Sequence, residues 1–229
     1  MAVILHIETA TSNCSVSLSD GERVLATIEL NEGYTHAENL HPFIEQLFKK
    51  TNLKPEHLNA VALSAGPGSY TGIRIGTSAA KGFCYALNIP LIAINTLQVL
   101  SAGAVKLIAE KDVILCPMLD ARRMEIYTAA YNDQLLETKK TEAKIVDENS
   151  VKEFRPDKIT YYFGDGMPKC KTLLQTHSGA KFLDNIVPSS SNMLNLALTK
   201  YKAKQFEDIA YFEPLYLKEY FLKQNNSRL

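Results

Sequence analysis

A glycine-rich stretch, AGPGSYTGIRIG at residues 65–76, lies between two apolar runs. A glycine turn between a strand and a helix can aim backbone N–H groups at an anion. This stretch lacks the Lys-Ser or Lys-Thr pair of a P-loop, and Pro67 interrupts the Gly-x-Gly-x-x-Gly pattern of dinucleotide-binding turns. Ser69 is not in a Gly-x-Ser-x-Gly elbow, which argues against a hydrolase nucleophile. The residues favour a structural turn over a phosphate or catalytic loop.

Histidines and acids are the other side chains that could do chemistry. His36 and His41 are five residues apart, about 140° around a helix, so they cannot both face one metal ion. Glu8 ends a strand-like run, at the place where a phosphate-binding hairpin could be. Asp120 precedes two arginines, a pattern that favours an ordinary salt-bridged turn. We therefore predict no catalytic residue, no metal ligand and no cofactor-binding residue in this chain.

Composition limits the classes of protein that fit. The 229 residues include 25 Lys and Arg against 25 Asp and Glu, a formal net charge of zero, so tight nucleic-acid binding by the chain alone is not expected. No apolar run reaches the roughly 20 residues that span a bilayer, and the first residues lack the basic region of a signal peptide. The four scattered cysteines indicate reduced, buried thiols, and we predict a cytoplasmic protein.

The first 130 residues alternate strand and helix patterns, which predicts an α/β domain with a mixed sheet. The strands near its middle are apolar on both faces, as buried strands are. The predicted strands are residues 3–7, 14–20, 23–30, 60–66, 89–95, 113–121 and 125–133.

Three helix patterns lie between these strands. Thr35 with Glu38 predicts a capping box at the start of the first helix, and Thr96 is expected to cap the third. The predicted helices are residues 35–53, 71–87 and 96–108.

After about residue 134 the chain becomes polar and lysine-rich, and we expect a solvated strand and helix there. A further strand is predicted at 158–166, with short helices at 167–175 and 192–203. The tail is aromatic and basic, and its last residues are expected to fray. No internal repeat is visible.

The second predicted helix has one face almost bare of side chains. Gly72, Gly76 and Ala80 recur every fourth residue, and such a face lets another backbone approach closely. We interpret this helix as a contact surface.

Four motifs together carry a resemblance to a known family. They resemble the bacterial TsaB (YeaZ) family, the accessory subunits of tRNA threonylcarbamoyladenosine biosynthesis, which is related to the TsaD (glycoprotease) family. The last 100 residues match only loosely, apart from Pro-Leu-Tyr-Leu near the end. The motifs are ILHIETATSNCSVSL at 4–18, THAENLHP at 35–42, GPGSYTGIRIG at 66–76 and DARRMEIY at 120–127.

The resemblance implies an actin/hexokinase/Hsp70-like (ASKHA) fold, α/β with two related subdomains of mixed sheets flanked by helices. We expect an N-terminal subdomain at 1–105, which carries the dimerisation helices, and a smaller, degenerate C-terminal subdomain at 106–229. The resemblance also implies a non-catalytic scaffold that binds a TsaD-type catalytic subunit, is joined by a TsaE-type ATPase and forms a homodimer when alone. Nucleotide and metal are expected on the partner, and tRNA contacts only within the complex.

Two segments of the sequence lack residues that a metal site and a nucleotide site would need, in agreement with the non-catalytic role that the resemblance implies. The first helix keeps His36 but has Asn39 and Leu40 where catalytic relatives place a second metal ligand, and the first hairpin turn lacks Asp-Gly-Thr. We expect Gly76→Arg to abolish dimerisation without unfolding the subunit. The predicted partner interface consists of His36, Leu40, Phe43, Leu47, Tyr70, Gly72, Ile73, Gly76, Ala80 and Phe83.

Three alternatives stay open from the sequence. The two helices could be ordinary core, with their apolar stripes packed only on their own sheet. The chain could be an independent ATP-using or glycoprotease-like metalloenzyme, which nucleotide binding and turnover by the isolated chain would reveal. It could also be a homodimeric scaffold with no role in tRNA modification.

Overall fold

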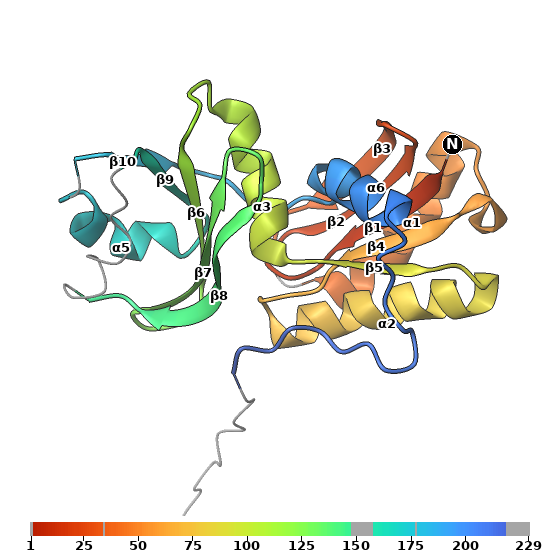
Figure 1. Ribbon diagram of the computed structural model, residues 1–229. Coiled ribbons are helices and arrows are strands. Elements are labelled where there is room, and N and C mark those ends of the chain that lie inside the picture. The colour runs from red at the N-terminus through yellow and green to blue at the C-terminus, as the bar shows by residue number, and fades with distance from the viewer. Residues whose placement is uncertain (1, 34, 148–157, 177, 219–229) are drawn as a thin grey trace, which may run out of the picture.

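The computed structural model describes residues 2–33, 35–147, 158–176 and 178–218. These residues form two β-sheets side by side, each with helices packed on it and one helix between them (Figure 1). The predicted α/β class is therefore confirmed. None of the helices in the described ranges is long and apolar enough to cross a membrane.

The first sheet is mixed and has the order β3-β2-β1-β4-β5. β2 runs antiparallel to both β1 and β3, whereas β1, β4 and β5 run parallel. β1 and β4 are almost wholly buried; β4 is mainly apolar on both faces, whereas β1 also buries the polar side chains of His6 and Glu8, and β3 is the partly exposed edge. The five strands are β1 (Val3–Glu8), β2 (Cys14–Asp20), β3 (Arg23–Leu30), β4 (Ala60–Ser64) and β5 (Leu91–Ile94).

Helices cover both faces of this sheet. α1 (His36–Thr51) and α2 (Tyr70–Leu87) pack on the face that presents Leu5 and Leu63. α6 (Leu194–Lys202) packs on the other face, where Ala197 joins Ile4 and Ala60. Alternate residues of β1 point to opposite faces, so one strand supports both layers.

Two of the predicted helix caps are wrong. Thr35 precedes α1, but its Oγ1 accepts a hydrogen bond from Asn39 Nδ2 at 2.8 Å and makes no cap bond. At α3 (Thr96–Ala104) the cap is Asn95, whose Oδ1 accepts from the backbone N–H of Leu97 at 2.9 Å. Thr96 is the first residue of that helix instead, one position beyond the cap.

The second sheet is also mixed and has the order β10-β9-β6-β7-β8, with one described helix, α5 (Met167–Leu174), after β9. β10 has no counterpart among the predicted strands, because it is a short, partly exposed edge strand without alternating hydrophobicity. Of the strand and helix expected in the polar segment after residue 134, β8 is the strand, and residues 148–157 of that region lie outside the described ranges. The strands are β6 (Ile114–Asp120), β7 (Glu125–Asn132), β8 (Glu137–Ile145), β9 (Thr160–Phe163) and β10 (Ala180–Leu183).

Both sheets have the same connectivity. Starting from the antiparallel edge, the order β8-β7-β6-β9-β10 repeats the order β3-β2-β1-β4-β5, so the β6–β7 hairpin corresponds to β1–β2. The turn from β9 to α5 likewise corresponds to the turn from β4 to α2. This repetition confirms the predicted pair of related subdomains with mixed sheets, although no repeat is visible in the sequence. The division at residue 105 stays a prediction.

Two segments connect the two sheets, one before the second sheet in the sequence and one after it. α3 contributes Leu97 to the core of the second sheet and Val99 to the core of the first. After β10 the chain returns to the first sheet, where Ser190 Oγ and Ser15 Oγ are hydrogen-bonded at 2.7 Å. Asn13 Nδ2 donates to the carbonyl oxygen of Pro188 at 2.9 Å.

Candidate functional site

The glycine-rich stretch forms the turn from β4 into α2 and lies directly against the β1–β2 turn. The N–H of Ser69 donates to the carbonyl oxygen of Ala10 at 2.6 Å, and the Ser69 side chain accepts from the N–H of Gly72 at 3.3 Å. A Cβ at Gly68 would lie only 2.2 Å from the Ala10 carbonyl oxygen. Glycine is needed here because two backbones touch. The backbone of Ala10 therefore occupies the space in front of this turn, where an anion would otherwise bind.

The small-residue face of α2 continues this close contact. A Cβ at Gly72 would lie 2.1 Å from the carbonyl oxygen of Thr9, and one at Gly76 would lie 2.3 Å from Thr9 Oγ1. Thr9 Oγ1 also donates to the carbonyl oxygen of Gly72 at 2.8 Å. Because this face packs inside the subunit, an arginine at Gly76 would disrupt the core. The expectation that Gly76→Arg spares the fold is wrong.

The ten predicted interface residues divide into buried and half-buried groups. Contact with a partner stays a prediction for all ten, but a buried side chain offers no surface to a partner in this conformation. Phe43, Tyr70 and Phe83 are the half-buried members and retain some exposed surface. The buried members are His36, Leu40, Leu47, Gly72, Ile73, Gly76 and Ala80.

A groove runs along the opposite, outward side of the same two helices. Its volume is about 780 Å³, and most of its lining is apolar or small. A second groove of about 550 Å³ shares His41 and Phe83 with it and continues to the end of α1. The first groove is lined from α1 by Ala37 and His41, and from α2 by Tyr70, Thr71, Arg74, Ile75, Ser78, Ala79, Gly82, Phe83 and Ala86.

The outward face of α2 has its own row of small residues, which sequence reasoning missed. Ser78, Gly82 and Ala86 recur every fourth residue and are exposed. A Cβ at Gly82 would have no atom within 4 Å. Gly72 and Gly76 form a similar row four residues apart, and the sequence does not show which row meets the sheet. An exposed glycine inside a long helix, costing about 1 kcal/mol relative to alanine, is the signal that could have found this face.

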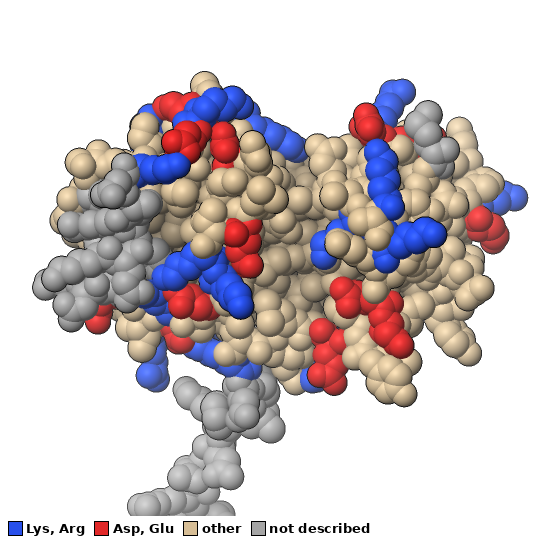
Figure 2. All heavy atoms as spheres, viewed as in Figure 1, with Lys and Arg blue, Asp and Glu red and all other residues tan. Residues whose placement is uncertain are grey.

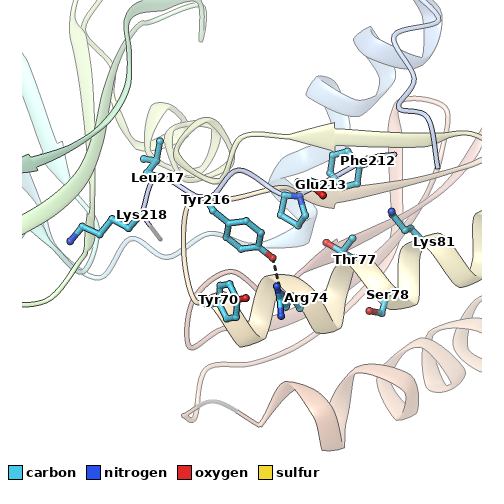
Figure 3. A pocket seen from close by; sticks show the side chains of 11 residues that line it. Tyr70, Arg74, Thr77, Ser78, Lys81, Phe212, Glu213, Tyr216, Leu217 and Lys218 are labelled. Carbon is cyan, nitrogen blue, oxygen red and sulfur yellow. Dashed lines mark hydrogen bonds between the residues drawn. The ribbon is translucent and has the colours of Figure 1, made fainter. Parts of the chain in front are cut away.

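The chain beyond α6 crosses α2 beside this groove. Residues 212–218, here called the C-terminal strap, are held by a bond from the N–H of Leu215 to the carbonyl oxygen of Ala65 at 2.7 Å. Figure 3 shows Arg74 beside the rings of Tyr70 and Tyr216, whose centroids are 5.0 Å apart. Its Nε donates to the hydroxyl of Tyr216 at 3.2 Å, and its Cζ lies 4.0 Å from the ring centroid of Tyr70.

A third hollow, of about 810 Å³, lies between α2 and the C-terminal strap. It shares Tyr70, Arg74 and Ser78 with the groove between α1 and α2, so the two hollows flank one ridge of α2. Figure 2 shows acidic and basic side chains interspersed on the face that it displays, with no extended area of one sign there. The lining of the groove between α1 and α2 is mostly apolar or small, so the groove offers shape and apolar contact more than a strong field.

Buried polar residues occupy the inside of the first subdomain. Burial raises the pKa of Glu8 to about 7, although its Oε1 accepts from the N–H of Ala10 at 2.7 Å. Burial also lowers the pKa of His6 to about 3, and His36 is buried with its Nε2 2.7 Å from the carbonyl oxygen of Thr11. In the described ranges, no three His, Cys, Asp or Glu side chains are placed to hold a metal ion.

Comparison with known proteins connects this geometry to a family. The family model described as TsaD, tRNA N6-adenosine threonylcarbamoyltransferase, matches residues 24–217. The chain is 28% identical over 223 residues to the tRNA threonylcarbamoyladenosine biosynthesis protein TsaB of Escherichia coli strain K12, covering 94% of each. It is 31% identical over 128 residues to the protein of the same name from Bacillus subtilis strain 168, covering 56% of this chain and 54% of that protein.

The solved structure of YeaZ from Pseudomonas aeruginosa has a TM-score of 0.81 with this chain at 23% identity. The match covers 95% of this chain and 100% of that one. At this identity the likeness shows a shared fold over nearly the whole chain.

Proposed function

Because the chain belongs to the TsaB (YeaZ) branch of the TsaD family, we propose that it is a non-catalytic subunit of the assembly that forms threonylcarbamoyladenosine on tRNA. Its role is to bind and support a TsaD-type transferase subunit. The observation that carries this proposal is the contrast on α2, whose inner face is sealed while its outer face forms an open apolar groove with α1.

Absence of a reaction centre is part of the proposal. The β4–α2 turn, where a phosphate could bind, is closed by Ala10, and Glu8 beneath it is fully buried. We expect nucleotide and metal to bind to the transferase subunit and not to this chain. Calorimetry of the isolated chain with ATP and Mg²⁺ checks this, since tight binding with turnover would refute it.

The partner is expected to dock on the outward groove of α1 and α2. We expect a transferase subunit of the same family to have a related pair of helices, because the family model covers α1 and α2, and two such pairs can pack as a pseudo-symmetric four-helix contact. Small residues at Ser78, Gly82 and Ala86 let helices approach closely, and Phe83 supplies an aromatic anchor. A second copy of this chain can use the same groove when the transferase subunit is absent.

The wider assembly follows from the same family membership. We propose that a TsaE-type ATPase joins the pair and that tRNA is contacted only in the assembled complex. We also place the chain in the cytoplasm, whose reducing conditions suit its four buried, free cysteines.

Gly82→Arg tests the docking surface. The Cβ at this position meets open space, so the substituted subunit should fold, while the guanidinium fills the middle of the groove. We expect affinity for the transferase subunit to fall by at least about 100-fold, measured by calorimetry, with an unchanged circular dichroism spectrum. Gly82→Ala is the matched control and should bind normally. An arginine variant that binds as tightly as wild type would remove the groove from the interface.

Reconstitution tests the function itself. Formation of threonylcarbamoyladenosine on a tRNA transcript, with the transferase subunit and ATPase present, should depend on this chain and fail with Gly82→Arg. Equal product with and without the chain would overturn the proposed role.

A further inference from the structure

The turn between β6 and β7 is an exposed loop that carries two adjacent arginines. Arg122 and Arg123 are exposed, and both have left-handed backbone conformations, with φ of 70° and 50°. This region favours glycine, and residues with a Cβ are found there less often. Strained backbone conformations of this kind cluster at functional sites, and here two successive arginines adopt one.

The turn is held in place from below by one lysine. Lys169 Nζ donates to the carbonyl oxygens of Arg123 at 2.8 Å and Glu125 at 2.6 Å, and it also pairs with Asp120. The N–H of Arg122 donates to Asp120 Oδ1 at 3.0 Å. Charge-assisted hydrogen bonds thus hold the backbone of the turn in one conformation, and the two exposed arginine side chains are attached to that fixed backbone.

The acids around the turn have other partners. Asp120 pairs with Lys169, and Glu125 pairs with Lys218 of the C-terminal strap. Asp165 accepts from the backbone N–H of Asp120 at 2.9 Å. The salt-bridged turn predicted at Asp120 is present, with Lys169 as the partner of Asp120, and within the described part of the chain no acidic side chain pairs with either guanidinium of the turn.

The strap brings a further cation to the same surface. Lys218 ends the strap, and its Nζ pairs with Glu125, the first residue of β7 after the turn. Since the strap also contacts α2 through Tyr216 and Arg74, this basic surface lies next to the proposed docking helix.

We propose that the β6–β7 turn is a contact site for the phosphodiester backbone of RNA, held by the guanidinium groups of Arg122 and Arg123. A guanidinium donates two parallel hydrogen bonds to a phosphate, which an ammonium cannot do. The identification of the RNA as tRNA rests on the proposed function. A chain of zero net charge binds RNA weakly alone, so this site adds contacts to those of the partner.

Binding of an unmodified tRNA transcript measures this site directly. Fluorescence anisotropy is recorded over a series of salt concentrations, for the complex with the transferase subunit and for the full chain alone. We expect Arg122→Ala with Arg123→Ala to weaken binding by the complex about tenfold. The slope of log affinity against log salt should fall by about 1 to 2, the change for two lost phosphate contacts.

Lys50→Ala with Lys200→Ala is the matched control. It removes the exposed charge of Lys50 from α1 and the half-buried charge of Lys200 from α6, away from the turn, and should leave affinity within about twofold of wild type. An equal loss in the control and arginine variants, or no loss in either, overturns the proposal. Circular dichroism and a thermal melt establish that both variants are folded.

The assembly step separates this proposal from the docking proposal. If the arginine variant no longer binds the transferase subunit but the chain alone keeps its RNA affinity, the turn is a contact for an acidic protein surface and the RNA proposal is overturned. If wild type itself does not bind the transferase subunit, the proposed function fails. RNA binding by the full chain and its arginine variant then still decides the role of the turn.

Discussion

The two subdomains use equivalent turns in opposite ways. Each has a glycine with a left-handed backbone after its fourth strand, Gly66 at φ 102° and Gly164 at φ 99°. Each also has a second glycine against the end of its first strand, Gly68 on Ala10 and Gly166 beside Leu119. In the first subdomain this closure buries the hairpin turn. In the second, the hairpin turn remains outside and presents arginines.

The difference is explained by what each turn packs against. The first turn lies under α2, whose inner glycines admit the backbone of Thr9, and above the buried carboxyl of Glu8. The second turn is supported from one side by Lys169 and faces solvent on the other. The hairpin turn of the first subdomain is part of the core, whereas the hairpin turn of the second subdomain is exposed and can contact another molecule.

Substituting the equivalent glycines gives the largest effect and tests this comparison first. Gly68→Ala places a Cβ 2.2 Å from the Ala10 carbonyl oxygen, and Gly166→Ala places one 2.8 Å from the Leu119 carbonyl carbon. We expect the free energy of unfolding in urea to fall by about 4 kcal/mol for Gly68→Ala and about 2 kcal/mol for Gly166→Ala. Equal losses would show that the two closures are equally tight.

Sequence reasoning located the strands and helices of the first subdomain well, although both helix caps predicted there are wrong. β4 is mainly apolar on both faces, β1 is rich in Val, Ile and Leu, and α1 has a clear helical stripe, so local pattern suffices. β10 is short and half exposed, and its pairing with β9 is the main reason that it is a strand. The matching strand order of the two sheets depends on such pairings and leaves no repeat in the sequence.

The sequence prediction put the partner interface on α1 and α2, and the structure buries the α2 face that it emphasised, Gly72, Gly76 and Ala80; contact with a partner at either face stays a prediction. Gly76 and Gly82 look alike as letters, yet Gly76 meets Thr9, 67 positions earlier in the chain, and Gly82 meets nothing. Only the tertiary contact distinguishes them. Arg122 and Arg123 were visible in the sequence, but their backbone conformation and their lack of acidic partners in the described residues were not.

Glu8 gives the next largest effect, because burial raises its pKa from 4.5 to about 7. Below about pH 4.5 the carboxyl is protonated in both states. As the pH rises, the unfolded chain releases this proton first, so stability is lost up to about pH 7. The loss should be about 3 kcal/mol, from about 1.4 kcal/mol for each pKa unit.

Glu8→Gln is the matched variant, since its amide oxygen can still accept from the N–H of Ala10. Buried histidines add their own pH dependence, so the informative quantity is the difference in unfolding free energy between wild type and variant. That difference should change by about 3 kcal/mol in favour of the variant between pH 4.5 and pH 7. A constant difference across this range would mean that Glu8 is not held in a desolvated site.

Glycine at the second hairpin turn gives the smallest effect, and its sign is opposite. A left-handed backbone costs a residue with a Cβ roughly 1–2 kcal/mol, while glycine also gains about 1 kcal/mol of freedom in the unfolded chain. Arg122→Gly with Arg123→Gly should therefore raise the free energy of unfolding by about 1 kcal/mol in total. Arg122→Ala with Arg123→Ala removes the same charges without relieving the backbone and should not stabilise. If the glycine variant is no more stable than the alanine variant in urea, the turn is unstrained, and the contrast with the first hairpin rests on exposure and charge alone.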